Sequence, residues 1–273
     1  MSLSVPQIAP SAPLVFITGA SSGIGQALAR RYAQAGWRLA LVARRTEVVA
    51  AWAAAQGLGA DRCAVYGADV AVPASIAAAG LECIARQGLP DCVVANAGIS
   101  VGMDSAEFDD LQVLQDTLAT NNLGLAATFQ PFLAAMWQRR SGTLVGIASV
   151  AAIRGLPGHA AYCASKAGVV AYCESLRGEC RPFGVRVVTL LPGYIATPLT
   201  AKNPYPMPFL MSAEAFAGQA FAAIKAGTSY RVIPWQMGLV AKVLRVLPNV
   251  LFDKLFAGRG RKPRRARSAQ PPI

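Results

Sequence analysis

The sequence predicts an α/β fold, in which helices cover both faces of a doubly wound parallel sheet. Short apolar runs that end near glycine alternate with segments of helical spacing along most of the 273 residues. Strands that alternate with helices of this length form βαβ units, which build parallel sheets. The chain also has 54% hydrophobic residues, enough for the buried core that one large domain of this size requires.

The elements follow one another in a regular order. The apolar run at 14–20 predicts a strand, and the segment 25–36 predicts a helix that ends at Gly36. The next strands are expected at 38–44, 61–70, 91–98, 142–149 and 184–193. The helices between them are expected at about 46–57, 73–87, 107–138 and 160–181.

The pattern changes after Gly193. A proline-rich apolar stretch predicts an irregular flap at about 194–226, with a helix around 212–226, before a strand at 230–235. We therefore divide the chain into a flexible lead at 1–13, one α/β domain at 14–235, and a segment at 236–273. This last segment has an apolar helical part up to 257 and a basic tail that we expect to be disordered.

The net charge of +12 is concentrated in this last segment. Nine basic residues and one acid lie between Lys242 and Arg267, so this stretch carries +8 of the +12. Cations beside an apolar segment predict peripheral contact with an anionic membrane, although the segment could equally pack on the core or on a second subunit. Specific nucleic-acid binding is not expected, because a short basic tail gives only weak, salt-sensitive affinity.

The cysteines and the N-terminus indicate a cytoplasmic protein without a metal site. None of the six cysteines forms a CxxC motif, and His159 is the only histidine, so we predict no metal centre and buried free thiols. The first residues lack the basic and apolar regions of a signal peptide, and no uncharged apolar run reaches 18 residues.

The stretch "TGASSGIG" at 18–25 has the composition of a phosphate-binding loop. It lies between the first strand and the first helix, where glycines let the backbone approach a pyrophosphate and the helix N-terminus offers free N–H groups. Its predicted cofactor-binding residues are Gly19, Ser21, Ser22, Gly23, Ile24 and Gly25. A tight loop that binds nothing is the competing interpretation.

The second strand ends in "LVARRTE", without the acid that usually holds the ribose of NAD. Arg44 and Arg45 stand there instead, and a guanidinium suits a 2′-phosphate through charge-assisted hydrogen bonds. The sequence therefore favours NADP, carried mainly by Arg44. The alternative is a pair of solvated arginines at a strand end.

Tyr162 and Lys166, in "YCASK", would share one face of a helix. They form either a surface pair without consequence or a proton donor whose pKa an ammonium lowers. Together with the glycine loop they resemble the short-chain dehydrogenase/reductase family, NADP-preferring branch, over residues 14–200. The resemblance implies a Rossmann fold and an oxidoreductase.

Further motifs carry this resemblance. The "ADV" at 68–70 is similar to an adenine-contacting Asp-Val motif, and "NAG" at 96–98 resembles the motif after the fourth strand. The segment "PGYIATP" resembles one that touches the nicotinamide. The resemblance adds these cofactor-binding residues: Asp69, Val70, Asn96, Ala97, Gly98, Tyr162, Lys166, Pro192, Gly193, Ile195 and Thr197.

The catalytic residues that the resemblance implies are Asn121, Ser149, Tyr162 and Lys166. Ser149 lies thirteen residues before Tyr162, and the spacing to Gly124 selects Asn121 over Asn122. Tyr162 would exchange a proton with the carbonyl oxygen that Ser149 holds, and Lys166 would lower its pKa and bind the nicotinamide ribose. Asn121 would position a water that links Lys166 to solvent.

The flap suggests a hydrophobic carbonyl or alcohol as substrate. Its candidate contacts are Tyr194, Tyr205, Met207, Phe209, Leu210 and Met211, with Leu156 and Met103. These side chains could instead simply seal the core. His159 is assigned no role, and a homodimer or homotetramer is implied by the family. The competing function is a redox-inactive NADP-binding sensor, which has no need of a proton donor.

Overall fold

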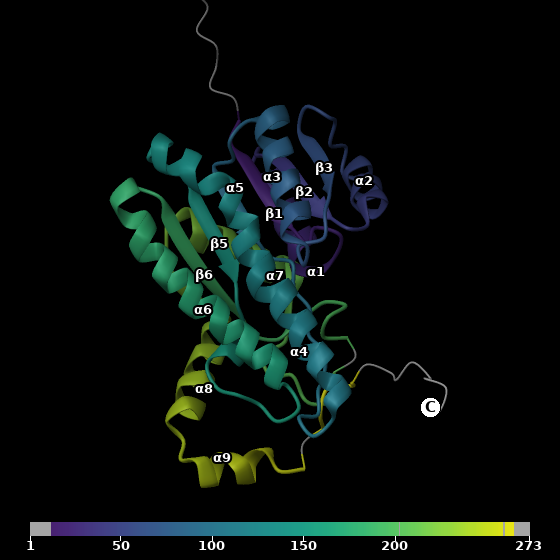
Figure 1. Ribbon diagram of the computed structural model, residues 1–273, viewed down its shortest axis with the longest axis vertical. Helices are drawn as coiled ribbons and strands as arrows, with labels where there is room; N and C mark the ends of the chain where they lie inside the picture. The colour runs from purple at the N-terminus through teal and green to yellow at the C-terminus, as the bar shows by residue number, and fades with distance from the viewer. Residues whose placement is uncertain (1–11, 202, 259, 265–273) are drawn as a thin grey trace, which may run out of the picture.

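A parallel sheet of seven strands forms the centre of the computed structural model, which describes residues 12–201, 203–258 and 260–264 (Figure 1). The strand order is β3-β2-β1-β4-β5-β6-β9. The strands are β1 (Leu14–Thr18), β2 (Arg38–Ala43), β3 (Cys63–Gly67), β4 (Cys92–Ala95), β5 (Thr143–Ile147), β6 (Arg186–Pro192) and β9 (Tyr230–Ile233). The predicted doubly wound sheet is confirmed.

Helices cover both faces of this sheet. They are α1 (Gly23–Gln34), α2 (Thr46–Ala55), α3 (Pro73–Gln87), α4 (Leu111–Leu118), α5 (Gly124–Arg139), α6 (Ala160–Cys180), α7 (Ala213–Lys225), α8 (Trp235–Val246) and α9 (Asn249–Phe256). Buried residues of α1, α2 and α7 share one hydrophobic cluster, and those of α3, α5 and α6 share another. Figure 1 shows the second set in front of the sheet.

The strand β1 shows why both layers form. Val15 and Ile17 pack into the first cluster, whereas Leu14 and Phe16 pack into the second. Successive side chains of a strand point to opposite faces, so a strand covered on both sides must be apolar throughout. This explains the uninterrupted apolar runs of the sequence.

The position of the site follows from the order of the strands. The chain moves outward from β1 through β2 to β3, and then returns to β4 on the other side of β1. The carboxyl ends of β1 and β4 therefore flank the point where the strand order reverses. Open α/β sheets bind their ligands in the crevice at this point.

The expected helix at 107–138 forms, but it is not α-helical throughout. It begins as α4, passes through a π-helical turn at Ala119–Leu123, and continues as α5. The wide turn contains Asn121, whose side chain bonds the backbone of Ile99 instead of facing solvent. The π-helical turn thus coincides with hydrogen bonds to a distant segment of the chain. The spacing of residues in the sequence did not reveal it.

The flap contains a small element that the sequence did not predict. Strand β7 (Ile195–Ala196) pairs in parallel with β8 (Met211–Ser212), which closes the loop between them into a compact unit. Ser212 then caps α7, its hydroxyl accepting a hydrogen bond from the backbone N–H of Ala215 at 3.1 Å.

The apolar segment after 235 forms α8 and α9, with Pro248 at the break between them. No helix in the described part of the chain is long and apolar enough to cross a membrane. The predicted lead lies outside the described residues except for residues 12 and 13, and the tail lies outside them except for residues 258 and 260–264.

Residues 260–264 correct the expectation of a disordered tail. They lie against the loop that follows β4, where Arg264 forms ion pairs with Asp110 and Glu107. The prediction counted the cations of the tail but not the acids at 104–110 that attract them, because the two segments lie about 150 residues apart in the sequence.

Candidate active site

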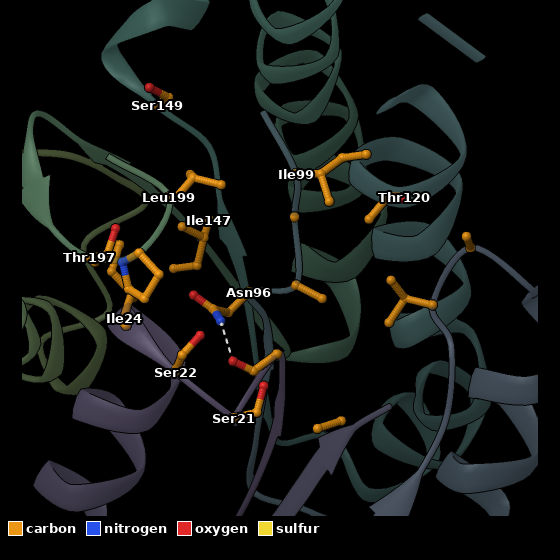
Figure 2. A pocket seen from close by; sticks show the side chains of 18 of the residues that line it. Ser21, Ser22, Ile24, Asn96, Ile99, Thr120, Ile147, Ser149, Thr197 and Leu199 are labelled. Atoms are coloured by element: carbon orange, nitrogen blue, oxygen red, sulfur yellow. Dashed lines mark hydrogen bonds between the residues drawn. The ribbon is translucent and has the colours of Figure 1, made fainter. Parts of the chain in front are cut away.

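A cleft with a volume of about 830 Å³ lies at the carboxyl ends of the strands. It brings together side chains from the loops after β1, β2, β3, β4, β5 and β6 and from α6 (Figure 2). All the predicted cofactor-binding residues line it except Gly25, which lies behind Gly19. Of the predicted catalytic residues, Asn121 alone does not line it.

The glycine loop forms one wall of the cleft. Gly19 has a positive φ of 69°, which L side chains rarely adopt. A Cβ on Gly25 would collide with the carbonyl oxygen of Gly19 and lie 2.6 Å from Nδ2 of Asn96. The loop is therefore packed so tightly against the end of β4 that glycine is required.

A threonine that the sequence analysis passed over ties this loop to β4. The Oγ1 of Thr18 accepts hydrogen bonds from the backbone N–H groups of Asn96 and Ala97, each at 3.1 Å. In return, Nδ2 of Asn96 donates to the carbonyl oxygen of Thr18 at 2.9 Å. Figure 2 shows Asn96 directed toward the loop that carries Ser21 and Ser22. The sequence feature that could have indicated this role is the threonine, with its hydrogen-bonding hydroxyl, directly before the first glycine of the loop.

Two arginines stand at the end of β2, and both line the cleft. Arg44 lies 3.7 Å from Oδ2 of Asp69, and its side chain is 72% exposed. Arg45 donates from Nη2 to Oγ of Ser21 at 3.3 Å, so it is attached to the glycine loop. The sequence analysis named only Arg44 as the main contact, because it follows the strand directly.

The predicted catalytic residues Ser149, Tyr162 and Lys166 share the opposite end of the cleft. Ser149 follows β5, and its Oγ accepts a hydrogen bond from the N–H of Ala151, which fixes the serine at the start of a short turn. The side chain of Ser149 is close enough to Tyr162 to lower the pKa of the phenol in part. Lys166 lies one turn further along α6, and its Nζ is 5.9 Å from the centre of the Tyr162 ring.

The pKa of Tyr162 differs in direction from the sequence-based expectation. Burial raises it above its usual value, and the nearby Ser149 side chain lowers it only in part. Lys166 makes no contribution that offsets this burial. Its Nζ donates to the carbonyl oxygen of Ile147 at 2.8 Å. Burial also lowers the pKa of Lys166, which is 5% exposed, to about 8.

Asn121 is fully buried behind the cleft wall. Its Oδ1 accepts from the N–H of Ile99 at 2.8 Å, and its Nδ2 donates to the carbonyl oxygen of Ile99 at 3.0 Å and to Oγ of Ser165 at 2.9 Å. A Cβ placed on Gly98 would lie 3.1 Å from Oδ1 of Asn121 and 3.4 Å from Nζ of Lys166. Asn121 and Lys166 therefore approach the same point of the backbone.

The segment after β6 closes the cleft from the other side. Pro192, Gly193, Ile195 and Thr197 all line it. Thr197 approaches the glycine loop, because a Cβ on Gly23 would lie 3.1 Å from Cγ2 of Thr197. Ile99, Val101 and Leu199 also line the cleft, and the sequence analysis did not name them.

The proposed substrate contacts do not form one group. Met103 is buried in a small cluster with Val113 and Ala161, so it is a packing residue. Phe209 and Leu210 are exposed, and Met211 packs against the core. The remaining candidates Met207 and Leu156 are partly buried, and none of the eight lines the cleft.

Tyr205 and Tyr194 lie near the catalytic end. Their ring centres are 6.3 Å apart, and Tyr205 also interacts electrostatically with Tyr162. His159 fixes Tyr205, with its Nε2 3.1 Å from the Tyr205 hydroxyl. The Nδ1 of His159 lies 3.1 Å from the carbonyl oxygen of Pro157, which can only accept, so Nε2 is the acceptor. A role for His159 was missed because a lone histidine carries no spacing signal.

Comparisons with known proteins show the family to which the chain belongs. A family profile described as short chain dehydrogenase matches residues 13–206. The chain belongs to the short-chain dehydrogenase/reductase family, and it is an oxidoreductase of that family.

Individual relatives cover most of the chain. An uncharacterized oxidoreductase of Myxococcus xanthus is 40% identical over 242 residues, which are 87% of this chain and 93% of the relative. The D-threitol dehydrogenase of Mycolicibacterium smegmatis is 40% identical over 69% of this chain and 72% of its own. An alcohol dehydrogenase of the archaeon Thermococcus sibiricus, complexed with 5-hydroxy-NADP, superimposes with a TM-score of 0.73 and 25% identity, over 81% of this chain and 96% of its own.

Proposed function

We propose that the protein is an NADP(H)-dependent oxidoreductase that interconverts a carbonyl and an alcohol, with Tyr162 as proton donor and acceptor. The observation that carries this proposal is the position of Ser149, Tyr162 and Lys166 in the same cleft as the glycine loop. A proton donor, a hydroxyl that can hold an oxygen, and a dinucleotide cradle are the parts that such a reaction needs.

The residues of the cleft fit a nicotinamide dinucleotide. The glycine loop leaves no room for side chains where a pyrophosphate would approach, and α1 begins at Gly23 with its free N–H groups. Asp69 and Val70 would flank the adenine, and Thr197 would meet the nicotinamide end. Arg44 and Arg45 would hold the 2′-phosphate of NADP, and both arginines line the same end of the cleft. When bound, NADPH supplies the hydride.

The proton chemistry rests on the pKa directions at the site. Because burial raises the pKa of Tyr162, the phenol is protonated at neutral pH and can donate to an alkoxide as it forms. Ser149 would hold the substrate oxygen beside the phenol. Lys166, with a pKa of about 8, is predominantly charged at pH 7 and would bind the ribose. Asn121 would hold the 98–99 backbone in place and support a proton path from Lys166.

The alternative is a redox-inactive sensor that binds NADP and acts through partners. Such a protein requires the cradle but not Ser149, Tyr162 and Lys166 beside it. We favour the enzyme, because the described cleft contains both.

The substrate that we propose is a small hydrophobic carbonyl or alcohol. Ile99, Val101 and Leu199 give the cleft an apolar surface between the glycine loop and Tyr162, and Tyr194 and Tyr205 lie close by. In Figure 2, Leu199 and Ile99 stand on opposite sides of the cleft.

We also propose a homodimer or homotetramer in the cytoplasm. Leu118, Leu123 and Tyr172 expose apolar surface on α4, on the π-helical turn and on α6, around a shallow hollow, and this face would pair with a second copy. The six cysteines are buried and unpaired, which supports a reducing compartment.

Peripheral contact with an anionic membrane is proposed through α8 and α9 rather than through the tail alone. These helices expose a run of apolar side chains that includes Val246, which is 80% exposed, and Lys242 and Lys254 lie among them. Apolar side chains beside cations are the composition of an interfacial helix.

The test of the enzyme is a substrate screen with purified protein. NADPH absorbance would be followed over aldehydes, ring ketones and long-chain ketones, with the Tyr162→Phe variant as the control. Turnover that depends on Tyr162 supports the proposal. NADPH binding without turnover of any carbonyl or alcohol would favour the sensor.

A further inference from the structure

The C-terminal residues 260–264, which we name the C-terminal strap, are anchored beside the cleft by a two-point ion pair. Nε of Arg264 donates to Oδ2 of Asp110 at 2.7 Å, and Nη2 donates to Oδ1 at 3.1 Å. The Asp110 side chain is only 8% exposed, so this pair is shielded from water and from salt on one side. Glu107 lies 3.6 Å from the same guanidinium.

The backbone of the strap is also fixed. The N–H of Gly102 donates to the carbonyl oxygen of Pro263 at 3.1 Å, and Gly102 forms a parallel β-bridge with Arg264. A Cβ on Gly102 would collide with the carbonyl oxygen of Lys262. The strap thus extends the loop after β4 as if it were a short added strand, and Figure 1 shows the yellow end of the chain alongside α4.

Lys262 connects the two sides of the cleft. Its Nζ donates to Oγ of Ser100 at 3.0 Å and to the carbonyl oxygen of Leu199 at 3.1 Å. Ser100 stands between Ile99 and Val101, which line one wall, and Leu199 lines the other. No carboxylate of the described residues lies within 4 Å of this ammonium, so the two neutral oxygens are its partners.

We propose that the C-terminal strap is a specificity-determining part of the substrate cleft, in which Lys262 is a positioning residue that sets the separation of the two walls. Arg264 holds the strap in place, and the hydrogen bonds of Lys262 fix Ser100 and Leu199 relative to the strap. This inference relies on the proposed carbonyl–alcohol reaction for the class of substrate. The contacts of Arg264 and Lys262 do not depend on that reaction.

The consequence is a limit on substrate size. The wall at 99–101 and the wall at Leu199 can separate only if the hydrogen bonds of Lys262 break or the strap leaves Asp110. A small carbonyl reaches Tyr162 without moving them, whereas a long or branched one requires them to part. The strap therefore penalises large substrates and leaves the chemistry of Tyr162 unchanged.

The experiment uses the full-length enzyme and a series of 2-ketones of increasing chain length. Lys262→Met removes the bridge between the walls, and Arg264→Gln removes the anchor. Both variants should raise kcat/KM for the longest ketones relative to the shortest by ~10-fold or more, the scale on which a pocket discriminates one or two methylenes. Thermal melting and NADPH affinity, measured beside them, report any loss of fold or cofactor site.

The matched control is Arg86→Gln, which removes an exposed arginine that pairs with Glu82 at 2.8 Å on α3. Its length profile should equal that of the wild type. An unchanged profile in both strap variants, or an equal loss for every ketone, would overturn the inference.

A second measurement keeps the test independent of turnover. Amide hydrogen exchange should become at least severalfold faster in residues 99–104 and 197–201 of both strap variants, but not of Arg86→Gln. If the wild type reduces no carbonyl, the proposed reaction fails while exchange still tests the strap. Equal exchange in the wild type and the strap variants shows that the strap does not couple the walls.

Discussion

Replacing Arg44 with Asp should reverse the cofactor preference. Arg44 is 72% exposed, so a hydrogen bond from it to a 2′-phosphate remains hydrated, and we take the lower end of the range for bonds to charged groups, about 1.5 kcal/mol. A carboxylate at the same place adds about 1 kcal/mol of repulsion, the value for unit charges 4 Å apart in water. The sum of about 2.5 kcal/mol corresponds to a loss of about 70-fold in kcat/KM with NADPH.

The assay measures kcat/KM with NADPH and with NADH before and after the change. Arg45→Ala should lower kcat/KM with NADPH by about 10-fold. Nη2 of Arg45 already donates to Oγ of Ser21, which leaves fewer of its N–H groups for the phosphate. Arg177→Asp, at an exposed position in the last turn of α6, makes the same charge change away from the cleft and should leave the ratio unaltered. A ratio that Arg44→Asp leaves unchanged would refute the assignment of Arg44 to the 2′-phosphate.

Three further predictions concern the catalytic end and the surface. Tyr162→Phe should lower turnover by ~10²–10⁴-fold, as expected for a lost general acid, and leave NADPH affinity intact; near-full turnover would exclude the mechanism. NADPH affinity, measured by fluorescence titration, should weaken above pH 8, because Lys166 is mostly charged only below its pKa of about 8. A Lys166→Met variant should lack this pH dependence. A titration that stays flat to pH 9.5 in the wild type would show that the charge of Lys166 does not hold the cofactor. The full-length protein should sediment with anionic vesicles in low salt and be released in high salt, and Val246→Glu should weaken this; equal sedimentation with neutral vesicles would contradict it.

The sheet and the cofactor loop were predictable because their signals are local. A strand buried on both faces must be apolar along its length, as residues 14–17 are, and a loop that approaches a phosphate must use glycine where Gly19 and Gly25 stand. The position of Tyr162 relative to Lys166 follows from one helical turn. These inferences need no knowledge of distant parts of the chain.

The other features depend on contacts between distant segments. Arg264 and Asp110 are 154 residues apart in the sequence, and Lys262 and Leu199 are 63 residues apart. A short stretch of sequence therefore never contains both partners of either pair. The raised pKa of Tyr162 has the same origin, because it reports how deeply the fold buries the phenol rather than how near Lys166 stands in the helix. Spacing in the sequence predicts where a residue lies on its helix or strand, whereas the pKa of the residue depends on how the rest of the chain packs around it.

The hydroxyl of Thr18 has a consequence for how the two halves of the cleft move. One oxygen accepts from two successive N–H groups at the end of β4, and the Asn96 side chain returns a hydrogen bond to the same threonine. The glycine loop and the backbone at 96–98 are thereby joined at a single residue, so the ends of β1 and β4 should move together. Arg44 follows β2 and takes no part in these hydrogen bonds. Replacing its side chain should therefore leave this junction in place.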